Sequence, residues 1–126
     1  MNKIEIINET VKFYSNDPYY LRSFDEDGDC AYNNTNNKHC AVGRCLMYKY
    51  KSRGKKLKGN YEDLTTLSNV HKIRFDKMLS PKYRGHDISF WVDLQELHDK
   101  DSYWNSNGLS IAGEEFVQRL KLVYDK

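Results

Sequence analysis

The sequence predicts an α+β fold, in which amphipathic N- and C-terminal helices and a central helix pack around a small antiparallel β-sheet. Two observations carry this prediction. Apolar residues recur at helical spacing near both ends of the chain and again in residues 87–100. An asparagine-rich stretch at residues 33–37 joins two short runs that are typical of hairpin strands. A chain of 126 residues fits a single domain over residues 1–126.

The first helix is predicted over residues 3–14, where apolar and charged positions separate onto two sides. The apolar stripe consists of Ile4, Ile7, Val11 and Tyr14. The charged residues Glu5, Glu9 and Lys12 lie largely opposite. The helix is expected to end before Pro18, because the residue that precedes a proline disfavours helical backbone angles.

A β-hairpin is predicted next, from the strands Cys30–Tyr32 and Lys38–Val42. The small residues of the segment CAVGRC, residues 40–45, fit a closely packed structural strand, in which Gly43 marks a bulge or a change of direction. Any larger sheet would draw strands from residues 46–50 or 65–79, and part of the second range fits a helix equally well.

Two further features lie between the hairpin and the central helix. Residues 49–58 read KYKSRGKKLK, with six basic residues in ten, which is typical of a solvated loop. Asn60 is a suitable cap for a short helix that begins at Tyr61.

The central helix is predicted from Asp87, as its N-cap, to Lys100, with His98 on one face or as a favourable cation near the C-terminal end. Its expected buried residues are Phe90, Trp91, Leu94 and Leu97. Residues 99–110 form a polar loop, after which Ser110 caps the last helix. The expected apolar stripe of that helix is Ile111, Phe116, Leu120 and Val123.

Composition excludes several classes of protein. Lys and Arg number 20 against 18 Asp and Glu, so the overall charge predicts no general affinity for nucleic acids. The N-terminus lacks the apolar core of a signal peptide, and no run is long enough to span a membrane, so a cytoplasmic protein is expected. Three cysteines, an odd number, favour reduced thiols over a disulfide framework.

Metal and catalytic chemistry find little support in the motifs. Cys30, His39, Cys40 and Cys45 offer zinc donors, but no C-x2-C spacing is present, and His39 and Cys40 would point to opposite sides of a strand. Buried thiols are the alternative that we prefer. Because no nucleophile motif or glycine-rich phosphate loop is present either, the expectation is a protein without catalytic activity, metal or cofactor.

Arginine and aromatic side chains remain as a binding chemistry, since an Arg fork pairs with phosphate and an aromatic face stacks on a base. The arginines considered are Arg22, Arg44, Arg74, Arg84 and Arg119. The aromatic candidates are Tyr20, Tyr83, Trp91, Tyr103 and Trp104. For Phe90 and Trp91, which lie on an amphipathic helix, a place in the core is at least as good an explanation.

Three stretches resemble a group of small phage and prophage proteins: CAYNNTNNKHCAVGRC, YRGHDISFWVDLQELHD and WNSNGLSIAGEEFVQRL. Within that group the chain is similar to the phage anti-Thoeris sponge family, which sequesters cyclic ADP-ribose isomers made by bacterial immune enzymes. The resemblance implies a β-core flanked by helices, and a homo-oligomer in the cytoplasm of a bacterial host. It also implies ligand pockets between protomers, and cyclic oligonucleotides at a second site of some members.

The resemblance implies a nucleotide stacked on Phe90 or Trp91, a hydroxyl read by Asn105, and phosphates paired with Arg119, with Arg84 or Arg44 in support. Two other hypotheses stay open. One is a nucleic-acid-associated protein that uses the loop 49–58 on phosphates, with steeply salt-dependent binding. The other is an inhibitor of a host protein that acts through a helical face.

Overall fold

The computed structural model describes residues 1–16, 18, 41–47, 64, 68 and 72–125. Several sequence predictions lie outside these residues: the hairpin from Cys30 to Cys40, the basic loop 49–58 and the helix start at Asn60 and Tyr61. The described part is mostly helical, with a small two-stranded antiparallel sheet. The predicted α+β class is therefore confirmed.

Helix α1 spans Lys3–Ser15 and confirms the first predicted helix. A capping box begins it, in which the Asn2 side chain accepts from the Glu5 backbone N–H and the Glu5 carboxylate accepts from the Asn2 N–H. Its buried residues are Ile6, Ile7, Thr10 and Tyr14. The buried side is thus displaced from the predicted stripe, since Ile4 and Val11 are only partly buried. Polar contacts from residues 44 and 83 cover the Thr10 side, which periodicity alone does not indicate.

Helix α6 spans Ile88–Asp99, with Asp87 at the N-cap position, and confirms the central helix. It buries all four predicted residues, Phe90, Trp91, Leu94 and Leu97. Gln95 and His98 are buried as well, so His98 is a core residue rather than a surface cation. The Tyr14 ring of α1 packs edge-on against the His98 ring, with centroids 5.1 Å apart, and this contact joins the two helices.

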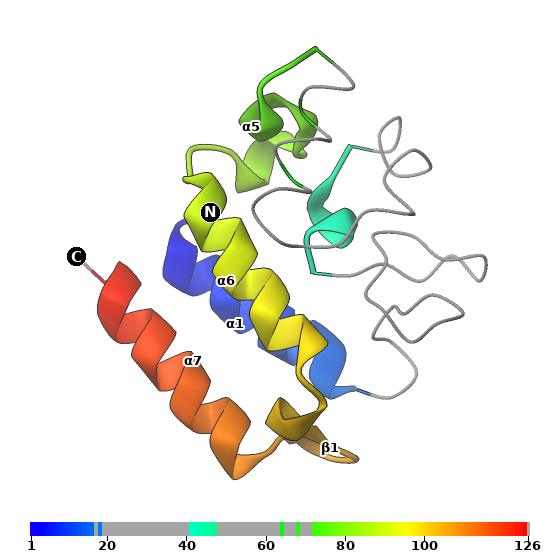
Figure 1. Ribbon diagram of the computed structural model, residues 1–126, viewed down its shortest axis with the longest axis vertical. Coiled ribbons are helices and arrows are strands. Elements are labelled where there is room, and N and C mark those ends of the chain that lie inside the picture. The colour runs from blue at the N-terminus through cyan, green and yellow to red at the C-terminus, as the bar shows by residue number, and fades with distance from the viewer. Residues whose placement is uncertain (17, 19–40, 48–63, 65–67, 69–71, 126) are drawn as a thin grey trace.

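Helix α7 spans Ile111–Tyr124, and Ser110 caps it as predicted by accepting a hydrogen bond from the Gly113 N–H. Its buried residues are Gly113, Phe116, Val117 and Leu120. The prediction is wrong for Ile111 and Val123, which are 78% and 61% exposed. Nine positions separate Ile111 from Leu120, about two and a half turns, so the two residues lie on opposite sides of the helix. Figure 1 shows α7 running along one side of the molecule, beside α6.

The sheet lies where the sequence predicts a polar loop. Strands β1, Trp104–Asn105, and β2, Gly108–Leu109, pair antiparallel with Trp104 opposite Leu109. A 3₁₀ turn at Asp101–Tyr103 leads into β1, and the Trp104 indole N–H donates to the Leu97 carbonyl over 2.8 Å. This bond anchors the hairpin to the end of α6.

The segment CAVGRC is not a strand in its described part, residues 41–45, because a 3₁₀ turn occupies Gly43–Cys45. The Cys45 N–H donates to the Val42 carbonyl, which closes the turn. Leu46 then forms an isolated antiparallel bridge with Leu79. The bridge connects the two ranges, 46–50 and 65–79, from which further strands were predicted. Helix α5, Phe75–Met78, and a 3₁₀ turn at Pro81–Tyr83 flank that bridge.

Candidate functional site

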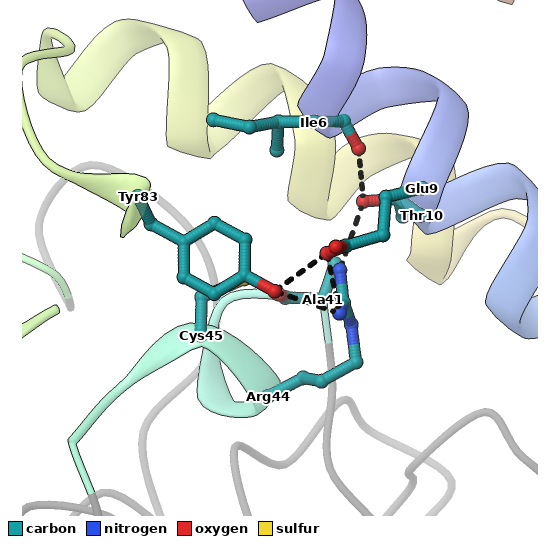
Figure 2. Close-up of polar contacts among 7 residues, drawn as sticks. All are labelled: Ile6, Glu9, Thr10, Ala41, Arg44, Cys45 and Tyr83. Carbon is teal, nitrogen blue, oxygen red and sulfur yellow. Dashed lines mark hydrogen bonds and ion pairs between the residues drawn. The ribbon is translucent and has the colours of Figure 1, made fainter. Parts of the chain in front are cut away.

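A polar cluster lies where α1 meets the two 3₁₀ turns at residues 43–45 and 81–83 (Figure 2). Glu9 and Thr10 come from α1, Arg44 from the first turn and Tyr83 from the second. These four residues are called the Arg44 cluster below. The chain brings them together over long sequence separations, because the buried faces of α1 and α6 fix where both turns pack.

The Arg44 guanidinium is bound on both of its terminal nitrogens. Nη1 lies 2.8 Å from Glu9 Oε1 and 3.3 Å from the Tyr83 hydroxyl, and Nη2 lies 3.2 Å from Thr10 Oγ1. The Tyr83 hydroxyl donates to Glu9 over 2.5 Å, and Thr10 donates to the Ile6 carbonyl. The Arg44 side chain is only 13% exposed, against 31% for Glu9. The fork that would pair with a phosphate therefore pairs with the protein itself.

Aromatic rings enclose the same guanidinium. Its central carbon lies 5.2 Å from the centroid of the Phe13 ring and 5.8 Å from that of the Tyr83 ring. Tyr83 packs edge-on against Trp91, with centroids 6.3 Å apart, and Trp91 packs in the same way against Phe90. The Arg44 cluster thus continues into the aromatic core of α6.

The ionisation states of Glu9 and Tyr83 follow from these contacts. Partial burial raises the pKa of Glu9, but the hydrogen bonds from Tyr83 and Arg44 and the charges of Arg44 and Lys82 outweigh it, so the pKa lies below the ordinary 4.5. Burial, followed by the hydrogen bond to Glu9, raises the pKa of Tyr83 well above its usual value. At neutral pH the cluster consists of a carboxylate, a guanidinium and a neutral phenol.

Because the folded protein holds the pKa of Glu9 below 4.5, its carboxylate contributes stability that is fully present above pH 4.5. That contribution is lost as the pH falls through the folded pKa. We expect the free energy of unfolding of Glu9→Gln to be about 1 kcal/mol lower than that of the native protein at neutral pH. This difference should become smaller in acid, where Glu9 of the native protein is protonated. Urea unfolding from neutral pH to about pH 3 measures this. Asp125→Asn, which changes an exposed carboxylate outside the Arg44 cluster, is the control and should show no such difference. If the difference in free energy of unfolding for Glu9→Gln stays constant in acid, the lowered pKa of Glu9 is wrong.

No family model, curated protein or solved structure matches this chain. The interpretation of the site therefore rests on the residues themselves.

The structure places the predicted ligand residues in different environments. Phe90 and Trp91 are fully buried, because both lie on the inward side of α6. Of the two roles considered for them, this is the place in the core. Among the described residues, the buried Trp91 Nε1 has no hydrogen-bond partner. Arg84 donates from Nε to the Leu79 carbonyl and from Nη2 to the Lys77 carbonyl, so it closes the end of α5.

Asn105 and Arg119 remain exposed. The Asn105 side chain accepts from the Asn107 N–H over 2.8 Å, which shapes the hairpin turn between β1 and β2. The Arg119 guanidinium lies 5.9 Å above the Phe116 ring on α7. Arg44, Phe90 and Trp91 are thus linked through Tyr83, whereas Asn105 and Arg119 stand on two other elements.

A second group of polar contacts lies on α6, where the buried Gln95 and His98 meet the partly exposed Asp99. Asp99 Oδ1 lies 2.8 Å from both Gln95 Nε2 and His98 Nδ1, and Gln95 Oε1 accepts from the Val42 N–H over 3.1 Å. Sequence reasoning missed Gln95 as a buried contact. The signal that was available is its position four residues after Trp91, one turn along the apolar side of the predicted helix.

Among residues 1–16, 18, 41–47, 64, 68 and 72–125, no group of three His, Cys, Asp or Glu side chains is placed to hold a metal ion. Cys45 is a buried thiol that donates to the Ala41 carbonyl. The other zinc donors considered, Cys30, His39 and Cys40, lie outside the described residues. In the part of the chain that the structure describes, no helix has both the length and the apolar character needed to cross a membrane.

An open hollow lies on the surface between residues 68 and 74. Its described lining consists of Ser68, Lys72, Ile73 and Arg74. Lys72 and Arg74 are exposed, and the Ser68 hydroxyl donates to the Ile73 carbonyl. Lys72 has a φ of +54°, the left-handed region that side chains other than glycine rarely adopt, and it is the one such described residue. Two cations thus line one concave surface.

Proposed function

We propose that this chain is a phage-type anti-defence protein that binds a cyclic nucleotide immune signal, such as a cyclic ADP-ribose isomer, and sequesters it without cleaving it. The observation that carries the proposal is the basic hollow at residues 68–74, which sets Lys72 and Arg74 around a concave surface. A pyrophosphate suits two neighbouring cations, and an Arg fork pairs with phosphate oxygens in two parallel bonds. The resemblance to the sponge family supplies the class of ligand.

The contacts of the proposed site differ from those that the resemblance implies. Arg44, Phe90 and Trp91 act as a scaffold in this proposal, since their side chains bind or pack within the protein. Lys72 and Arg74 take the phosphates, and Ile73 offers a small apolar surface to a sugar or base. Arg119 and Asn105 are exposed and remain the alternative contacts.

The backbone at Lys72 adds support. A residue with a side chain in the left-handed region costs about 1–2 kcal/mol, and such strain gathers at ligand sites. In the proposed site this strained residue is itself part of the lining of the hollow.

The test is a retention experiment. The protein is incubated with cyclic ADP-ribose isomers, washed on a filter that retains it, and heated to release bound nucleotide. We expect unchanged nucleotide in the final filtrate of the native protein. Arg74→Ala and Lys72→Gly should each reduce retention at least about tenfold, the effect of about 1.4 kcal/mol of lost phosphate pairing. Lys72→Gly removes the charge and relieves the backbone strain, so its melting temperature should not fall.

Arg119→Ala is the matched control, because it removes an exposed arginine outside the hollow. Retention equal to that of the native protein supports the hollow as the site. If only Arg119→Ala loses retention, the hollow is not the binding site, and the phosphate contact lies on α7 instead. Appearance of a degraded nucleotide, or no retention by the native protein, refutes the sponge function itself.

The same cations would suit the phosphates of a nucleic acid, and ionic strength separates the two cases. Binding to a nucleic acid falls steeply with salt because many phosphate contacts release counterions together. A pocket that holds one small nucleotide has few such contacts. We expect retention of the cyclic nucleotide to change by less than about tenfold when salt rises from about 50 to 200 mM.

A further inference from the structure

The outer side of α7 exposes large apolar side chains at both of its ends. Ile111 is 78% exposed and Leu122 is 74% exposed. Eleven positions separate them, about three turns of helix, so they lie on the same face. The opposite face of α7 packs against α1 and α6 (Figure 1). This apolar pair therefore points away from the core of its own chain.

Polar residues complete the outer face in an ordered way. Glu115 and Gln118 lie between Ile111 and Leu122 on the same stripe, and both are exposed. Glu114 and Lys121 follow one edge of the stripe, with the acid near the start of the helix and the base near its end. A face with opposite charges at its two ends is complementary to itself when one copy is reversed.

We propose that α7 pairs antiparallel with α7 of a second copy of this chain. The twofold axis passes between positions 116 and 117. Ile111 then packs on Leu122 of the partner subunit, and Glu114 lies beside Lys121 of the partner subunit. Each contact occurs twice, as twofold symmetry requires. Edge residues of this kind set orientation and partner choice in paired helices.

Charge is what selects the antiparallel arrangement of two copies. A parallel pair would set Glu115 of one chain against Glu115 of the other within the seam, with like charges in contact. Reversal of one helix sets Glu115 opposite Gln118 of the partner subunit and leaves Glu114 beside Lys121 of the partner subunit. It also sets each positive helix end beside the negative end of the other helix.

This inference is independent of the proposed nucleotide site, because the hollow at residues 68–74 and the outer face of α7 share no residue. Variants of one surface leave the other intact. A monomer that retains nucleotide, or a dimer that does not, tells which of the two proposals fails.

The experiment measures the mass of the full chain by sedimentation equilibrium over a range of concentrations. We expect a concentration-dependent dimer for the native protein, and dimerisation at least about tenfold weaker for Leu122→Glu. Val123→Glu is the matched control, because Val123 is also exposed but lies about 100° around the helix from Leu122. Dimerisation that Leu122→Glu leaves unchanged overturns the proposal, as does a native protein that stays monomeric up to about 1 mM.

A charge exchange tests the orientation. Glu114→Lys and Lys121→Glu should each weaken the dimer, since each brings like charges together at both ends of the seam. The double variant should restore it, because every ion pair is re-formed with its signs reversed. A double variant as weak as the single ones overturns the antiparallel pairing. Circular dichroism melts of all three variants show whether each chain remains folded.

Discussion

Replacement of Gly113 by alanine is expected to destabilise the protein by about 3 kcal/mol, although alanine is the better helix former by about 1 kcal/mol. A Cβ at position 113 would meet the Tyr103 carbonyl oxygen far inside van der Waals contact, and would lie 2.9 Å from Leu109 Cδ2. The Tyr103 oxygen belongs to the backbone, so a side-chain rotation cannot relieve the clash.

Relief of the clash would require α7 to move away from the Tyr103 carbonyl, and this movement would break other contacts. The Tyr103 carbonyl accepts from the Ser110 N–H over 2.8 Å, and the Tyr103 ring stacks on Phe116 with centroids 4.7 Å apart. Both join the start of α7 to the 3₁₀ turn before β1. Movement of α7 by the width of a methyl group therefore disturbs the hairpin as well as the helix.

Urea unfolding measures the effect of Gly113→Ala. Gly85→Ala is the control, because a Cβ there has nothing within 4 Å but the backbone has a φ of +100°. That variant isolates the cost of left-handed backbone, about 1–2 kcal/mol. If Gly113→Ala is as stable as the native protein, α7 does not begin against the Tyr103 carbonyl.

Replacement of Arg44 by methionine is expected to cost about 2–3 kcal/mol. Methionine keeps much of the side-chain volume but removes the cation that pairs with Glu9, which keeps the hydrogen bond from Tyr83, and removes the Arg44 donor to the Thr10 hydroxyl. Loss of one partner of a buried ion pair costs about 3–5 kcal/mol, and the partial exposure of Glu9 reduces that figure because water hydrates the remaining charge. The contact of the guanidinium with the Phe13 ring is lost as well.

The double variant Arg44→Met with Glu9→Gln separates the ion pair from the packing. We expect it to lose less than the two single variants together, because removal of the second charge no longer leaves a buried ion alone. Urea unfolding of the four proteins at neutral pH completes the cycle. Additive losses would show that Arg44 acts through its packing on Phe13 and Tyr83 and not through Glu9.

The two variants test different parts of the interpretation. Gly113→Ala addresses how α7 docks on the hairpin, which in turn sets the face that α7 presents outward. Arg44→Met addresses why an arginine that resembles a phosphate ligand in sequence serves as a structural ion pair. If Arg44→Met lost nucleotide retention while it stayed stable, the phosphates would be assigned to the Arg44 cluster and not to the basic hollow.

Local signals predicted the helices well. The capped stripe of residues 3–14, the apolar spacing of 87–100 and the Ser110 cap all depend on contacts three or four residues apart. Phe90 and Trp91 show the limit of such signals. Their positions on the apolar side of α6 indicated burial, but the same side chains also suit a stacked base, and periodicity does not distinguish the two roles.

The sequence by itself determined where α1, α6 and α7 begin and end, because helix caps and the spacing of apolar residues are local. Tertiary structure alone decided the rest. The ion pair of Arg44 joins residues 35 positions apart, and the bridge of Leu46 with Leu79 joins two segments whose pairing no local pattern specifies. Tertiary structure also placed Ile111 on the outer side of α7, because the missing side chain of Gly113 lets the helix dock closely on Tyr103. Such contacts depend on which surfaces meet when the chain packs, and a local pattern carries no record of that choice.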